Sequence, residues 1–154
     1  MQKELSEHLA TMLDADFDIV VLPEKELPKE FLSQGRKNYY RAEKIIKALQ
    51  TTPYDNITTI ALTQDRICTS YKGHPNWSVH GLSIGNACVI TTSHLGTKNK
   101  LWKVVVHEFI HTFYDYPHCP KDDPTCIMRD AKGHADMSNK NGLCHYCDSV
   151  INKR

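Results

Sequence analysis

The chain lacks a long apolar run. None of its apolar stretches approaches the roughly 20 residues that a membrane-spanning helix needs. The opening MQKELSEHLATML has neither the basic head nor the apolar centre of a secretory signal peptide. We therefore expect a soluble cytoplasmic protein without a membrane partner.

An excess of charge of one sign is also missing. The chain has 19 Lys+Arg against 18 Asp+Glu, for a formal net charge of +1. Such a balance gives no long-range field that would attract nucleic acid or an anionic membrane. A stripe of interleaved basic and aromatic residues is missing as well, which argues against a zinc module that contacts nucleic acid.

A second domain is not expected, because 154 residues are too few for two ordinary domains and no linker, repeat or low-complexity tract divides them. We expect a monomer with one domain, 1–154. Helical spacing of apolar residues predicts helices over 1–13, 36–50, 99–114 and 144–152. Short runs rich in β-branched residues predict strands at FDIVVLP (17–23), NITTIALT (56–63), SVHGLSI (78–84) and ACVITT (87–92). This order favours an α/β (α+β-like) fold, a mixed sheet with helices packed on it.

Six cysteines are present, and they are unevenly distributed. Cys68 and Cys88 stand alone on strand candidates, where we expect buried thiols. The other four lie in the last third of the chain, and two of them form CHYC, whose two-residue gap lets both sulfurs face one metal ion. We favour zinc over disulfides for this group, although an even cysteine count also permits disulfides.

The stretch VVVHEFIHTFYDYPHC holds a metal-binding pattern on the helix predicted over 99–114. His107 and His111 are four residues apart, so one helical face presents both imidazoles to a single ion. Glu108 lies about 100° around the helix, where it can hold a water molecule and act as a general base. Three interpretations stay open: a working zinc hydrolase, a zinc protein that has lost catalysis, or ordinary histidines on a half-buried helix.

The third ligand of such a site has two candidates, since Pro117 stands six residues after His111. Asp115 follows the helix directly, before the backbone has turned back. His118 follows a proline that fixes its approach. We therefore expect His118 and not Asp115 to complete the site.

The same stretch, together with CIM and CHYC, resembles the archaemetzincins, a branch of the metzincin zinc peptidases. Their signature runs His-Glu-x-x-His-x-x-Gly-x-x-His-Cys, then Cys-x-Met, then Cys-x-x-Cys. Upstream, GRKNYYRAEKIIKAL, TIALTQDRI and SVHGLSIGNACVITT are similar to the first helix, the next strand and the edge-strand region of that family. The likeness covers most of the chain from Asp18 onward.

The resemblance implies a metzincin-like mixed twisted sheet with an active-site helix over 1–118 and a zinc-stapled, Cys-rich subdomain over 119–154. It implies zinc-dependent hydrolysis of peptides or small proteins by a metal-bound water that Glu108 activates, with the substrate extended beside SVHGLSI. Met128 would lie in a turn beneath the catalytic ion. Two Zn²⁺ ions per chain are implied, with these ligands: His107, His111 and His118 for the catalytic ion, and Cys119, Cys126, Cys144 and Cys147 for the structural ion.

The chain departs from the family signature in the loop after the helix. Tyr114 stands where the family has Gly, one extra residue precedes His118, and the gap between Cys119 and Cys126 is longer than usual. Tyr resists the positive φ that Gly accepts. Two functions remain in view: an active peptidase, which we favour, and a catalytically silent two-zinc fold that acts as a binding module.

Overall fold

The computed structural model describes residues 2–50, 57–93, 95, 98–131 and 137–153, with backbone alone for residues 98–100. Its helices have the following bounds: α1 Gln2–Met12, α2 Ala42–Leu49, α3 Lys98–Phe113 and α4 His145–Ile151, with a short 3₁₀ turn at Lys29–Phe31. Its strands have the following bounds: β1 Tyr39–Arg41, β2 Thr59–Thr63, β3 Arg66–Tyr71, β4 His74–Val79, β5 Gly81–Ile84 and β6 Ala87–Thr91.

The strands form two three-stranded sheets, ordered β1-β3-β4 and β2-β6-β5. Each sheet is mixed. β1 is parallel to β3, and β4 pairs antiparallel with β3. β2 is parallel to β6, and β5 pairs antiparallel with β6. The α/β class is confirmed, but the expected single sheet is divided in two. The division falls at His80, which separates β4 in one sheet from β5 in the other.

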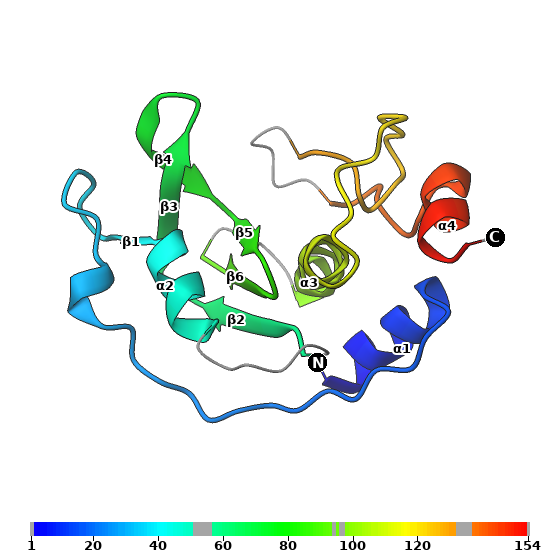
Figure 1. The fold of residues 1–154 in the computed structure, drawn as a ribbon, viewed down its shortest axis with the longest axis horizontal. Coiled ribbons are helices and arrows are strands. Elements are labelled where there is room, and N and C mark those ends of the chain that lie inside the picture. Colours follow the sequence, from blue (N-terminus) through cyan, green and yellow to red (C-terminus); the bar gives the residue numbers. More distant parts are fainter. Residues whose placement is uncertain (1, 51–56, 94, 96–97, 132–136, 154) are drawn as a thin grey trace.

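The second sheet lies between two helices (Figure 1), and β6 is buried along its whole length. Successive side chains of a strand point to opposite faces. Val89 accordingly packs with α2 residues such as Ile46, whereas Ile90 joins the core around α3. α3 is thus held against the edge of the sheet that carries β5.

The N-terminal helix also packs on α3, as its apolar spacing predicted. Leu9 and Leu13 are buried in the core around α3, and the ring of His8 stacks on Trp102 with 3.6 Å between centroids. Phe17, just beyond the helix, makes an edge-to-face contact with Phe109. The chain start thus covers the side of α3 that faces away from the strands.

Two sequence expectations are wrong in this N-terminal third. FDIVVLP is an irregular segment rather than a buried strand, and Val20 is 78% exposed. The helix expected over 36–50 begins only at Ala42, because the preceding Tyr39–Arg41 pairs with β3. Pro53, which would stop any continuation of this helix, lies outside the described residues.

In the cysteine-rich stretch between α3 and α4 the described residues form no helix or strand, and the Lys103 side chain of α3 holds part of it. The Lys103 ammonium of α3 is buried and donates to the Met137 carbonyl oxygen at 2.8 Å and to Asn141 at 3.1 Å. Cys144 caps α4 by accepting from the Cys147 amide. No described helix is both long and apolar enough to cross a membrane.

Candidate metal centre

Three histidines come together beside the end of α3. His107 and His111 project from the same face of the helix, and His118 approaches from the loop that follows. One ring nitrogen of each lies within 4.8 Å of the others. Asp115 is outside this group, so the structure brings together the three histidines that the sequence singled out.

The hydrogen bonds of the two helical histidines define their tautomers. Nδ1 of His107 lies 2.7 Å from the Ile127 carbonyl oxygen, and Nδ1 of His111 lies 2.6 Å from that of Tyr116. A carbonyl oxygen can only accept, so both protons are on Nδ1 and both Nε2 atoms keep a lone pair. Metal-bound histidines are typically oriented in this way by a second partner.

The two Nε2 atoms face each other 3.0 Å apart. Two lone pairs at that distance repel unless a cation lies between them. Burial, with His111 nearby, lowers the pKa of His107 to about 3, so His107 itself holds no second proton near neutral pH. Zinc bound by two imidazoles at about 2.0–2.1 Å holds their nitrogens about 3.3 Å apart, which fits the observed spacing within a few tenths of an ångström.

The helix ends one residue later than the family signature implies. Tyr114 still donates its amide to the Ile110 carbonyl at 3.1 Å, and the left-handed residue is Asp115, with φ of 48°. Asp tolerates this conformation better than most residues because its short polar side chain can hydrogen-bond locally. The inserted residue therefore moves the turn from Tyr114 to Asp115 and leaves His118 able to reach its two partners.

Glu108 lies against strand β5. Its Oε2 accepts a short hydrogen bond from the Ser83 hydroxyl, and a Cβ added at Gly81 would stand 2.8 Å from its Oε1. Burial raises the pKa of Glu108 above its ordinary value, against the opposing effects of Ser83 and His111. Gly81 and Ser83 are therefore small because the carboxylate occupies the space beside them. The resemblance had placed an extended peptide substrate beside this same strand.

A pocket of 430 Å³ opens beside this carboxylate. Its lining includes Gly81 to Ser83 of β5, Glu108 and His111 of α3, and Asp115 to His118 of the loop that follows. β5 pairs with β6 on one side only among the described strands, so its other edge borders the pocket. The arrangement joins a free strand edge, a buried carboxylate and three imidazoles.

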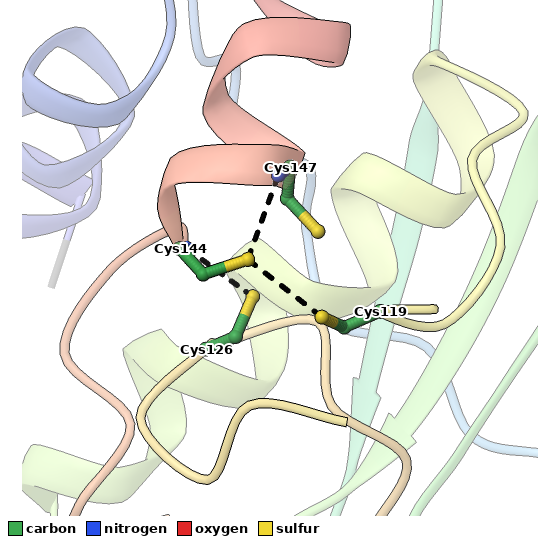
Figure 2. Close-up of side chains that lie close together, drawn as sticks. All are labelled: Cys119, Cys126, Cys144 and Cys147. Atoms are coloured by element: carbon green, nitrogen blue, oxygen red, sulfur yellow. Dashed lines mark hydrogen bonds between the residues drawn. The ribbon is translucent and has the colours of Figure 1, made fainter. Parts of the chain in front are cut away.

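Four cysteines form a second cluster (Figure 2). Its members are Cys119, Cys126, Cys144 and Cys147, with sulfurs within 4.8 Å of one another. The Cys119 and Cys144 sulfurs are 3.7 Å apart. Tetrahedral zinc with bonds of about 2.3 Å holds its sulfurs about 3.8 Å apart, so the cluster fits zinc.

The cysteines of the cluster are free thiols rather than disulfides. Burial raises the pKa of Cys126 to about 11 and holds that of Cys147 well above its usual range. Cys68 and Cys88 are also free and completely buried, outside the cluster. Burial and the nearby Glu108 raise the pKa of Cys88 to about 12, as expected for an inert buried thiol.

Three groups at the histidine site were not identified from the sequence. They are the Ser83 hydroxyl and the carbonyl oxygens of Tyr116 and Ile127. Small residues at alternate positions of one strand were the available signal for Ser83. The Tyr116 hydroxyl points to the Cys147 sulfur, 3.3 Å away, and not into the histidine site. Met128, directly after Ile127, is fully buried.

No family model matches the chain. Among characterised relatives, it is 26% identical over 169 residues to the archaemetzincin of Halobacterium salinarum, with 98% of this chain and 91% of that protein covered. The same values hold for the archaemetzincin of a second strain of that species.

Two solved archaemetzincin structures share the fold. The one from Methanopyrus kandleri matches with a TM-score of 0.77 and 21% identity, covering 98% of this chain and 83% of that one. The one from Archaeoglobus fulgidus, a complex with malonate, matches with a TM-score of 0.66 and 22% identity, covering 96% and 92%. The chain is archaemetzincin-like, as its motifs predicted, and this likeness supports a zinc metallopeptidase-like function.

Proposed function

We propose that this archaemetzincin-like chain hydrolyses peptide bonds with one zinc ion at the histidine cluster, and that a second zinc ion at the cysteine cluster stabilises the fold. The observation that carries the proposal is the pair of Nε2 lone pairs, 3.0 Å apart, at the edge of an open pocket that also contains Glu108. Zinc bound there would acidify a water molecule and polarise a peptide carbonyl.

Glu108 is proposed as the general base. It takes the proton of the attacking water and returns it to the leaving amine. Burial raises its pKa toward neutrality, which makes it a stronger base than an exposed carboxylate. Ser83 donates a hydrogen bond to Oε2 and so leaves Oε1 to accept the proton.

A peptide in extended conformation is the proposed substrate. The free edge of β5 offers backbone donors and acceptors to such a chain, in the manner of strand addition. Asp115 to His118 also line the pocket beside this edge. The openness of the histidine site favours hydrolysis over a silent zinc fold, which would need its remaining coordination position closed.

Glu108→Gln in the full chain tests this function. The amide keeps the shape of the side chain but cannot accept a proton, so peptide cleavage should fall by about a hundredfold or more. Zinc content, measured by elemental analysis, should stay at two equivalents. Glu24→Gln, an exposed change outside the pocket, is the control and should cleave a peptide library at the parental rate. Equal turnover in Glu108→Gln and the parent would exclude this mechanism.

A further inference from the structure

Each histidine of the metal centre is connected to the cysteine cluster by a short path. His107 donates to the carbonyl of Ile127, which directly follows Cys126 in the chain. His118 directly precedes Cys119. The third path, from His111 to Cys147, runs through the side chain of a single residue, Tyr116.

Tyr116 contacts both clusters at once. Its carbonyl oxygen lies 2.6 Å from His111 Nδ1, and its hydroxyl donates to the Cys147 sulfur at 3.3 Å. The neighbours Asp115, with its left-handed backbone, and Pro117 leave this loop few alternative paths. Fixing the ring therefore fixes the carbonyl that orients His111.

The sulfur of Cys147 differs from the other three in its hydrogen-bond donor. The other three accept from backbone amides: Lys121 and Asp123 for Cys119, Cys144 and Met128 for Cys126, and Cys147 for Cys144. Two of these contacts can be followed in Figure 2. Four thiolates around a doubly charged cation carry a net charge of about −2, so each donor stabilises the site. For Cys147 that donor is a side chain, the Tyr116 phenol.

We propose that Tyr116 is a positioning residue that couples the two clusters: its hydroxyl is held by the Cys147 thiolate, and its carbonyl thereby orients His111 toward the catalytic ion. This inference rests on the proposed function in that it takes both clusters as metal sites. Coupling between sites is reciprocal, so filling either cluster strengthens binding at the other. Losing an outer partner of a metal ligand weakens metal affinity about 10- to 100-fold.

Tyr116→Phe in the full chain removes only the hydroxyl. Tyr114→Phe is the matched control, since it removes a phenol hydroxyl two residues away in the same loop. The first readout uses Co²⁺ in place of Zn²⁺, because only the thiolate site gives sulfur-to-cobalt charge transfer. Without the phenol donor the Cys147 sulfur gives up electron density more easily, so this absorption should move to longer wavelength in Tyr116→Phe and stay unchanged in Tyr114→Phe.

The second readout is the zinc dissociation constant of the histidine cluster, measured by competition with a chromophoric chelator after the cysteine cluster is filled. It should rise about tenfold in Tyr116→Phe and stay at the parental value in Tyr114→Phe. Parental values in either readout for Tyr116→Phe, or equal effects in both variants, would overturn the coupling. Peptide cleavage is not measured, so an inactive protein that binds both ions leaves the inference standing. A parent chain that binds no ion at the histidines would reject the proposed function and the coupling together.

Discussion

The histidine and cysteine clusters come from adjoining parts of the chain but differ in exposure. The His118 side chain is 47% exposed, and its cluster borders the 430 Å³ pocket. Cys126 and Cys147 are completely buried. Three neutral imidazoles leave a cation its full charge and an open position, whereas four thiolates complete its coordination and exceed its charge. Adjoining parts of one chain can therefore provide an open ligand set suited to chemistry and a closed one suited to stability.

The largest expected effect is a loss of thermal stability, which shows whether the clustered cysteines bind metal or only pack in the core. Cys144→Ala should lower the melting temperature by roughly 10 °C or more, because loss of a structural zinc site costs several kcal/mol and each kcal/mol shifts a chain of this size by about 2–4 °C. Cys68→Ala is the control. Cys68 is fully buried and Cys144 only half-buried, so packing alone predicts the reverse order. Calorimetry showing Cys68→Ala as the less stable variant would contradict the structural zinc site.

The next effect concerns the third ligand of the histidine cluster. His118→Ala should weaken zinc binding there more than about a hundredfold, beyond the range for outer-shell partners. Asp115→Asn should leave it unchanged. Asn is chosen because residue 115 has φ of 48°, which Asn tolerates. Chelator competition on both variants distinguishes them, and a stronger effect at residue 115 would make Asp115 the ligand.

The two clusters should also respond differently to pH. Burial raises the pKa of Cys126 to about 11 and that of Cys147 well above its usual range, so each thiol loses a proton when zinc binds at neutral pH. Burial lowers the pKa of His107 to about 3 and also lowers that of His118, so both imidazoles are already neutral. One pH unit upward from neutrality should therefore strengthen the cysteine site at least about a hundredfold, tenfold for each of the protons that Cys126 and Cys147 release, and barely change the histidine site.

Chelator titrations of the full chain at two pH values on either side of neutrality measure how the zinc affinity of each cluster changes with pH. Competition with a chelator of known proton affinity is needed, because the chelator itself binds zinc more tightly at high pH. Equal slopes at the two clusters would remove the proposed difference between thiol and imidazole ligands.

The smallest expected effect concerns the position of Glu108, the proposed general base. Gly81→Ala places a Cβ 2.8 Å from Glu108 Oε1, so the carboxylate must move, and peptide turnover should fall about tenfold. Zinc affinity at the histidines should not change. Gly142→Ala, whose added Cβ meets nothing within 4 Å, is the control. Unchanged turnover in Gly81→Ala would show that Glu108 does not need its observed position.

The helices α1, α3 and α4 could be predicted from the sequence because local signals and packing agree there. In α3 the apolar residues recur at helical spacing, and Val105, Val106 and Phe109 among them are buried, although Phe113 at the helix end is 41% exposed. The ligand clusters could also be predicted from the sequence, since helix geometry fixes the spacing of His107 and His111. The same holds for Cys144, the N-cap of α4, and Cys147 in its first turn.

Pairing between distant segments could not be predicted in this way. Val20 and its neighbours have the composition of a strand, but no local signal says whether another strand edge is available, and no strand in the described part of the chain pairs with them. Tyr39 fits a helical period, yet its pairing with Arg66 determines its conformation. Ser83 and Tyr116 act on residues 25 and 31 positions away, beyond the reach of any periodic pattern.

The exposed run Val20–Leu22 also bears on the solubility of this chain. Its residues are 70–78% exposed, and short β-branched apolar runs of this kind can initiate intermolecular β-aggregation. The flanking sequence limits this hazard. Asp18 stands on one side, and Pro23, Glu24 and Lys25 stand on the other, where charges and a proline that cannot donate a hydrogen bond oppose stacking of identical chains. Replacing these flanking residues would leave both metal clusters intact and still make the protein prone to aggregate during expression.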